Sequence, residues 1–430
     1  MKKLSLLFYF LLSLKTNILA NEMYFYASSA LKNNPKYKAE IKNFDATKQN
    51  KNISRSEFLP SITLSGSIDS STSTNRKDKS GSSLADSNLD TEVKKIEVEQ
   101  KIFQGFQGYN SFKKSELEIE QASLELKNTM QDTILEAVKA YADLSLKIKN
   151  IKFNNENTDL FERQVESDNS RLQKGEITLS DLAQAESSLA KAKANLILAE
   201  TELQTAKTNF ERIIGIKTPG NVSDISLNIL PPINFNTVLT KSTAKNPKLL
   251  ISIIDYEISK KDLSIEMSKI SPSAKLNYSK SESSDFSSTV DKVDQEKVKA
   301  TVTWPLIKGG KNYSSIKKSK LKKQQSELIL EDVKNKVKTD TTNFWSIYQS
   351  SKSILASTKA QLKAAEIASE GITLEYDSGD TRTTLDVIQS RSLLLEAKIA
   401  NARAERNLLI SELKILAQMG ELNLEALKNR

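Results

Sequence analysis

The chain contains 430 residues, carries a formal net charge of +9 and has neither cysteine nor histidine. The absence of these two residue types removes thiol nucleophiles, imidazole bases and nearly all transition-metal ligation, so we predict a protein that is not an enzyme and holds no metal or cofactor. Acidic and basic residues are interspersed along the helical stretches, which argues against a nucleic-acid partner despite the positive charge.

The first twenty residues, MKKLSLLFYFLLSLKTNILA, have the pattern of a secretory signal peptide. Lys2 and Lys3 precede an apolar run from Leu4 to Leu14, and a small residue, Ala20, stands before a plausible cleavage point. The run is shorter than the roughly 20 apolar residues that a membrane-spanning helix needs. We therefore expect residues 1–20 to be a signal peptide and the mature chain to be exported without a transmembrane helix.

Two pairs of segments alternate apolar and polar residues with a period of two, which predicts strands of about ten residues, the length of a tilted membrane strand. One hairpin is expected at about residues 61–103 and a second at about 273–307. The polar stretches between the strands, SSTSTNRKDKSGSSLADSNLD and SKSESSDFSSTVDKVDQE, predict loops. The positions of the apolar face are Ile62, Leu64, Gly66, Ile68, Ile96, Val98, Gln100 and Ile102, then Ala274, Leu276, Tyr278, Val298, Ala300, Val302 and Trp304.

Long stretches without glycine or proline follow each pair of strands. Because an interior glycine costs about 1 kcal/mol and an interior proline about 3 kcal/mol, such stretches predict long helices. A helix of about 65 residues would be roughly 100 Å long, so we expect coiled-coil helix pairs rather than a globular domain. The two pairs are predicted at about residues 109–214 and 311–419.

The same landmarks occur twice along the chain. The matched pairs are Pro35/Pro247 and Pro60/Pro272, which are 212 residues apart, and Gly105/Gly309, Tyr109/Tyr313 and Gly175/Gly379, which are 204 apart. Each half has the same order of a helix, a hairpin, a very long helix, a glycine turn and a second helix. We therefore predict two structural repeats, residues 21–220 and 221–430.

Two hairpins give each chain four strands. Four strands cannot close a barrel, and unpaired strand edges are not tolerated in lipid. Bacterial membrane barrels begin at about eight strands. We therefore predict an obligate oligomer in which several chains share one barrel.

The chain resembles the outer-membrane efflux protein (TolC-like) family in its duplicated NP sequences, its strand-to-helix junctions at Gly105 and Gly309, and the motif YDSGDTRTTLDV followed by ANAR. The resemblance implies a mixed all-α plus membrane-β fold: a homotrimer with a 12-stranded β-barrel in the bacterial outer membrane, continued by a 12-helix α-barrel in the periplasm. It implies the exit duct of a tripartite efflux or type I secretion system. The implied partners are outer-membrane lipid, a periplasmic adaptor protein and an inner-membrane pump of the RND or ABC class.

The resemblance also implies roles for residues at the two glycine turns. Gly175 and Gly379 mark the periplasmic tip, where the adaptor docks. Tyr376 and Arg382 match side chains of a latch that holds the tip closed. The corresponding latch partners in the first repeat are Asp181 and Ser180.

Two further positions match the aperture at the tip. Asp386 matches an acidic ring, and Gln389 stands where a second acidic ring is usual. Three copies of Asp386 at about 6 Å would repel by roughly 3 kcal/mol per pair, so the pKa of Asp386 is expected to rise and the ring to attract cations. The second repeat also has one extra residue after its glycine, which we assign to Asp380.

Each of these assignments has a simpler structural alternative. Asp181 and Asp386 each sit early in a helix and could cap it. Tyr376 could be a packed aromatic, and Arg382 could be solvated. Trp304 follows a strand and is expected to be a membrane-interface aromatic rather than a ligand contact. The alternative functions are a periplasmic adaptor or a structural exported coiled coil, and two hairpins with apolar faces argue against both.

Overall fold

The computed structural model describes residues 22–220, 222, 234–287, 289–378 and 382–428. The predicted signal peptide, residues 1–20, lies outside this part of the chain. The chain divides into two compact units. We call them the helical unit (residues 1–42, 124–250 and 332–430) and the strand unit (residues 43–123 and 251–331).

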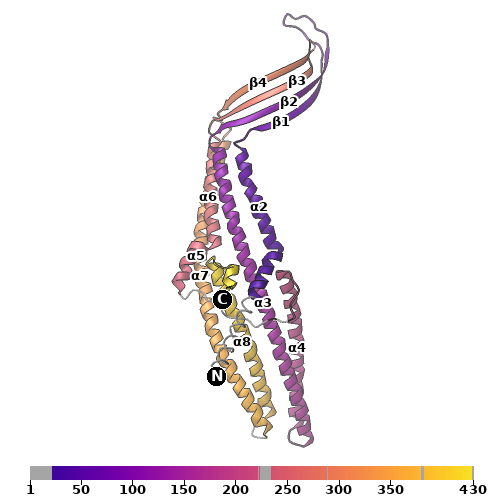
Figure 1. Cartoon of the computed structure of the whole chain (residues 1–430), viewed down its shortest axis with the longest axis vertical. Helices are drawn as coiled ribbons and strands as arrows, with labels where there is room; N and C mark the ends of the chain where they lie inside the picture. The colour runs from indigo at the N-terminus through magenta and orange to yellow at the C-terminus, as the bar shows by residue number, and fades with distance from the viewer. Residues whose placement is uncertain (1–21, 221, 223–233, 288, 379–381, 429–430) are drawn as a thin grey trace, which may run out of the picture. The chain divides into compact units, whose positions relative to one another are not determined.

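The strand unit contains one antiparallel sheet of four strands in the order β1-β2-β3-β4 (Figure 1). The strands are β1 (Ser61–Ser73), β2 (Ser87–Gln104), β3 (Ser273–Ser287) and β4 (Val290–Thr303). Two hairpins are joined side by side through β2 and β3, with Val98 opposite Tyr278. The predicted content of four strands per chain is confirmed.

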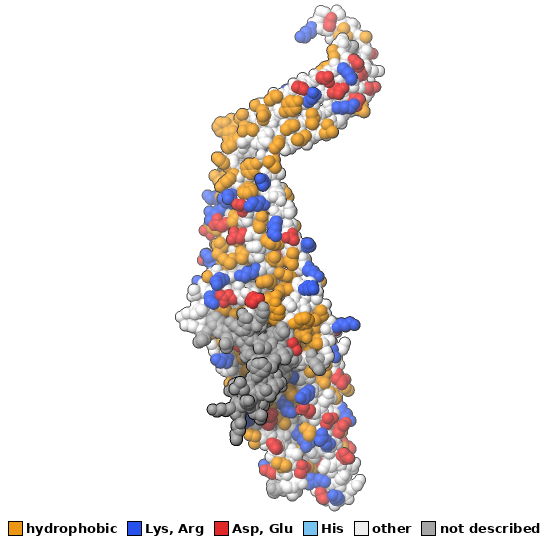
Figure 2. All heavy atoms as spheres, in the orientation of Figure 1, with side chains coloured by type: hydrophobic (Ala, Val, Ile, Leu, Met, Phe, Trp, Pro, Cys, Tyr) orange, Lys and Arg blue, Asp and Glu red, His pale blue; other side chains and the backbone are white. Residues whose placement is uncertain are grey.

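One face of the sheet is apolar over the half that lies nearer the helix ends. Ile62 lies opposite Val98, and Leu64 opposite Ile96, so the predicted apolar positions share one face. The sheet is a single layer, and Leu64 is 80% exposed. Figure 2 shows apolar side chains gathered over this half of the sheet and charged side chains toward the hairpin turns.

The strands are longer than the sequence predicted. They contain 13 to 18 residues each, where about ten were expected. The stretch predicted as the second loop is mostly strand, and β4 begins three residues after β3 ends. Cross-strand ion pairs stabilise the polar ends of β3 and β4 near their turn. The ammonium of Lys280 lies 2.8 Å from the carboxylate of Glu296, and that of Lys292 lies 3.3 Å from the carboxylate of Glu282. The first hairpin, in contrast, retains a loop over residues 74–86.

The long helices largely occupy the stretches that lack glycine and proline, although α3 includes Gly108 in its first turn and α7 continues through Gly371. The helices are α2 (Pro35–Ser56), α3 (Gln107–Gln173), α4 (Leu179–Ile214), α6 (Pro247–Ser268), α7 (Lys311–Asp377) and α8 (Thr384–Gln418). Both α3 and α7 have 67 residues. Before α3, Gly105 has φ +60°, and a Cβ there would lie 2.4 Å from that of Ser271, so only glycine fits this junction. Among the described helices, none has an eighteen-residue stretch apolar enough to cross a membrane.

The core of the helical unit contains large side chains from several helices. Tyr26 stacks on Tyr141 with ring centroids 5.2 Å apart, and Phe210, Leu409 and Leu413 are fully buried. Each such side chain contributes roughly 1.5–3 kcal/mol when removed from water. This packing stabilises short helices that the sequence did not predict, at residues 22–33, in α5 (Phe235–Lys245) and in α9 (Leu424–Lys428).

Candidate functional site

The turn between α3 and α4 is built around Gly175. Its amide bonds to the carbonyl of Leu172, and the amide of Glu176 bonds to the carbonyl of Arg171. These two bonds form a Schellman motif, which needs a left-handed residue at the position of Gly175, whose φ is +78°. The side chains of Arg171 and Glu176 also form an ion pair of 3.2 Å. The first predicted tip glycine is therefore required by the local backbone.

The helices that follow the two turns begin in the same way. Thr178 is the N-cap of α4, and its amide donates to the carboxylate of Asp181 over 2.9 Å. Thr383 is the N-cap of α8, and its amide donates to the carboxylate of Asp386 over 2.9 Å. Both acids also accept the hydroxyl of their threonine, which completes a capping box. In a single chain both acids therefore act as helix caps.

Hydrogen bonding lowers the pKa of both capping acids. The backbone N–H of Thr178 and then its hydroxyl lower the pKa of Asp181. The same two groups of Thr383 lower the pKa of Asp386. The expected rise for Asp386 is therefore not found in the single chain, because the donors of Thr383 favour the ionised carboxylate.

Tyr376, near the end of α7, connects α7 to α3 and α8. Its hydroxyl donates to Oδ1 of Asp168 on α3 over 2.7 Å and lies 3.0 Å from Oγ1 of Thr384 on α8. The guanidinium of Arg171 lies 4.4 Å from the centre of the Tyr376 ring. Burial and then the hydrogen bond to Asp168 raise the pKa of Tyr376. The hydroxyl therefore stays protonated and remains a donor at neutral pH.

Asp168 is fully buried, which is uncommon for a carboxyl group. Its Oδ1 also accepts a hydrogen bond from Gln164 over 2.9 Å, whereas its Oδ2 has no hydrogen-bond partner among the described residues. Arg391 on α8 is partly buried and interacts electrostatically with Asp377 and then with Asp168. Asp168 is buried, and one of its two oxygens already has no partner in the described part of the chain. The loss of a hydrogen bond to its other oxygen would therefore cost considerable folding free energy.

The remaining predicted latch residues lie elsewhere in the single chain. Tyr376 bonds Asp168 and not Asp181 or Ser180, because the carboxylate of Asp181 is held by its own cap and Ser180 is exposed. Arg382 forms an ion pair of 2.6 Å with Glu375. The pairing of Tyr376 and Arg382 with Asp181 and Ser180 stays a prediction.

The other predicted positions differ in exposure. Gln389 is exposed on α8. Gly379 and the extra residue assigned to Asp380 lie outside the described residues. Trp304, directly after β4, is 61% exposed and donates its indole N–H to the carbonyl of Ile270 over 3.2 Å. Within the described part of the chain, no group of three or more acidic side chains could hold a metal ion.

Sequence reasoning missed Asp168, although the sequence contains a signal for it. Phe161 and Val165 precede it at helical spacing, so Asp168 continues the apolar side of α3 toward the turn. An acid in line with apolar residues needs a buried partner. That partner comes from the other repeat and could not be identified from spacing alone.

A family model described as "Outer membrane efflux protein" matches residues 26–216 and 262–421, which is most of the chain. The chain belongs to the outer membrane efflux protein family. This efflux protein is thus an outer-membrane transport protein, as the sequence motifs predicted, and neither an adaptor nor a structural coiled coil.

Two curated proteins are similar to the efflux protein along most of its length. It is 25% identical over 399 residues to outer membrane efflux protein BepC of Brucella suis biovar 1 (strain 1330), covering 93% of this chain and 85% of BepC. It is 23% identical over 423 residues to outer membrane protein TolC of Escherichia coli (strain K12), covering 94% of this chain and 83% of TolC.

Solved structures share its fold. The Campylobacter jejuni CmeC outer membrane channel has a TM-score of 0.82 at 15% identity, covering 95% of this chain and 87% of CmeC. The open state of the Neisseria gonorrhoeae MtrE outer membrane channel has a TM-score of 0.71 at 15% identity, covering 93% of this chain and 88% of MtrE. The fold of the efflux protein is therefore that of outer-membrane channels.

Proposed function

We propose that this efflux protein is a homotrimeric channel-tunnel, in which three sheets close one 12-stranded barrel and the helices continue it as a 12-helix tunnel. The observation that carries the proposal is the pair of unpaired sheet edges. Among the described residues, β1 pairs only with β2, and β4 pairs only with β3. Because open edges are not tolerated in lipid, β1 of one chain pairs with β4 of the next.

Two features of the strand unit support this assembly. The exposed apolar face, with Leu64 and Val302 at 80% and 74% exposure, suits contact with lipid once the barrel is closed. Equal spacing of elements supports the two repeats, since α6 and β3 begin 212 residues after α2 and β1. The repeats 21–220 and 221–430 then each contribute one hairpin and one coiled-coil pair.

The channel is the exit duct of a tripartite efflux or type I secretion system, with a periplasmic adaptor and an inner-membrane pump of the RND or ABC class as partners. The glycine turns form the tip at which the adaptor docks. The hydrogen bond between Tyr376 and Asp168, at 2.7 Å, supports a latch that holds the second turn against α3. Arg382, Asp181 and Ser180 contribute contacts between chains, and Asp386 with Gln389 lines the aperture.

Cysteine cross-linking tests the pairing of sheet edges, because the chain has no native cysteine. Ser65 on β1 is changed to cysteine together with one of Lys297, Lys299 or Thr301 on β4, and the protein is oxidised in outer membranes. Disulfides between neighbouring chains are expected for at least one pair. The product on a denaturing gel is a covalent ladder that ends at the trimer.

A matched pair, Ser65→Cys with Ser279→Cys on the inner strand β3, serves as control. These two positions are separated by β2, so about 10 Å divides them within a chain and they cannot form a disulfide. A ladder that ends at dimers or continues beyond trimers would contradict the proposed stoichiometry. The absence of any cross-link for all three edge pairs would contradict the shared barrel.

A further inference from the structure

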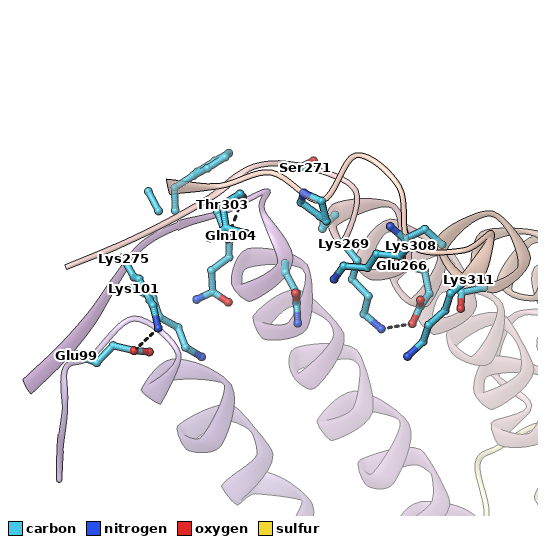
Figure 3. Close-up of a pocket in the computed structure, with 18 residues that line it drawn as sticks. Glu99, Lys101, Gln104, Glu266, Lys269, Ser271, Lys275, Thr303, Lys308 and Lys311 are labelled. Carbon is cyan, nitrogen blue, oxygen red and sulfur yellow. Dashed lines mark hydrogen bonds and ion pairs between the residues drawn. The ribbon is translucent and has the colours of Figure 1, made fainter. Parts of the chain in front are cut away.

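A cavity of about 560 Å³ lies where the strands join the helices of the strand unit (Figure 3). Its walls come from the ends of β2, β3 and β4, the end of α6 and the first turns of α3 and α7. All of these residues belong to the strand unit. The strand residues Glu99, Lys101 and Lys275 stand on the polar face of the sheet, opposite to the face of Leu64 and Val98.

The cavity is strongly basic. It is lined by five lysines, Lys101, Lys269, Lys275, Lys308 and Lys311, and by two glutamates, Glu99 and Glu266. Lys275 pairs with Glu99 over 2.7 Å, Lys269 with Glu266 over 2.5 Å and Lys101 with Glu57, directly after α2, over 2.7 Å, so three of the five lysines are neutralised. Among the described residues, the ammonium groups of Lys308 and Lys311 have no ion-pair or hydrogen-bond partner, so their charges are not neutralised within the chain.

Comparison of the two repeats shows that Lys308 and Lys311 are not needed for the fold of the junction. The positions 204 residues earlier are Gln104 and Gln107, which line the same cavity. The backbone is alike, since Gly105 and Gly309 have φ of +60° and +53°, and each long helix begins two residues after this glycine. The junction of the first repeat therefore forms with glutamine at both positions. The two lysines of the second repeat add positive charge that the fold of the junction does not require.

We propose that this cavity binds soluble multivalent oxyanions, that is, molecules that carry several phosphate or carboxylate groups. Lysine binds such groups as a point charge, and a recess lined by one sign of charge concentrates the opposite ion. That the cavity opens into the lumen rests on the proposed barrel, in which the sheet face that carries the strand residues of the cavity becomes the inner face. Three copies of the cavity then form a basic collar that lines the lumen of the proposed barrel.

Calorimetric titration of the purified full-length protein with tripolyphosphate tests the binding site. The double variant K308Q/K311Q gives the second repeat the residues of the first, so the fold is preserved. We expect it to raise the Kd for tripolyphosphate by about tenfold at low salt, and we expect added salt to weaken wild-type binding. The control K317Q/K320Q removes the same charge from the side of α7 away from the cavity and should leave the Kd unchanged. Equal affinity of wild type and K308Q/K311Q would overturn the proposal.

A lipid headgroup offers the same phosphate chemistry, so the titration is repeated in nanodiscs of zwitterionic lipid with and without phosphatidylglycerol. A soluble ligand in the lumen predicts the same Kd in both. Competition by phosphatidylglycerol would overturn the assignment to a soluble anion. Failure of the binding test while edge cross-links still end at the trimer would contradict this inference alone and leave the channel intact.

Discussion

The turn between α3 and α4 and the turn between α7 and α8 have the same local design and different tertiary contacts. Both following helices begin with a threonine cap and an aspartate capping box, at Thr178 and at Thr383. Only the second turn carries a buried tyrosine, and the corresponding position of the first repeat is Leu172. The comparison teaches that the cap is a property of each turn, whereas the contact of Tyr376 with Asp168 exists only where the two repeats meet.

The largest effect is expected from removing the contact of Tyr376 with Asp168, which is present at only one of the two turns. Tyr376→Phe with Arg382→Glu removes the hydrogen bond to Asp168 and reverses a charge at the turn. The loss of a bond to a buried carboxyl group costs roughly 2 kcal/mol, an about thirtyfold change in the opening equilibrium. We expect higher channel conductance in planar bilayers and greater drug leakage in cells. Tyr313→Phe, at an exposed tyrosine of the strand unit, is the control. Unchanged conductance would show that the closed state is held by other contacts.

The next prediction concerns Asp386 at the second turn, which we propose lines the aperture. At the same distance and dielectric, each carboxylate attracts a divalent cation twice as strongly as it repels a neighbouring carboxylate, so loss of the ring should weaken block at least about tenfold. Asp386→Asn should therefore reduce block by Mg²⁺ in planar bilayers, and Gln389→Glu should strengthen it by adding a second ring. Asp181→Asn, the matching cap of the first repeat, is the control. Equal block in wild type and Asp386→Asn would rule out an acidic aperture.

The caps themselves should behave alike in the two turns. Thr178→Ala and Thr383→Ala each remove one capping side chain and should cost about 1 kcal/mol locally. Hydrogen exchange measured by mass spectrometry should show an equal loss of protection over the first turns of α4 and α8. Only Thr383→Ala should also increase hydrogen exchange at the end of α7, because Tyr376 near that end contacts the first turn of α8 through Thr384. A much larger loss at one helix would mean that the two caps are not equivalent.

The smallest effect is a dependence on pH that both turns share. The pKa values of Asp181 and Asp386 are lowered in the folded chain, first by the backbone N–H of their threonine. Their stabilisation is present above the ordinary aspartate value of about 4 and is lost as the pH falls through the lower folded pKa. Protection of α4 and α8 should be constant from pH 7 to 5 and fall only below about pH 4. In Asp386→Asn this acid-dependent loss should vanish from α8 and persist in α4.

Much of the fold could be predicted because its causes are local. Stretches without glycine and proline located most of each 67-residue helix, and the left-handed conformation of Gly105 explains why α3 begins two residues after it. The first turn was predictable for the same reason, since Gly175 satisfies a left-handed position that any helix end of this type needs.

The parts that could not be predicted depend on contacts between distant segments. The polar segments that contain Lys280 and Glu296 were predicted to be a loop, because the ion pair between these residues becomes apparent only when the strand pairing is known. The short helix α5 has a single face to bury, and Val238 becomes buried only through tertiary packing. Asp168 was missed because its donor lies 208 residues away, on the other repeat.

The unequal hairpins determine where foreign sequence can be inserted. In the loop over residues 74–86, Asp78 accepts hydrogen bonds from the amides of Ser80 and Ser82, so this segment is organised by its own residues. In the second hairpin only two residues separate the end of β3 from the start of β4. An epitope tag therefore belongs beside Gly81, where an added Cβ meets no atom within 4 Å, and the proposed trimer would display it three times, once for each first hairpin.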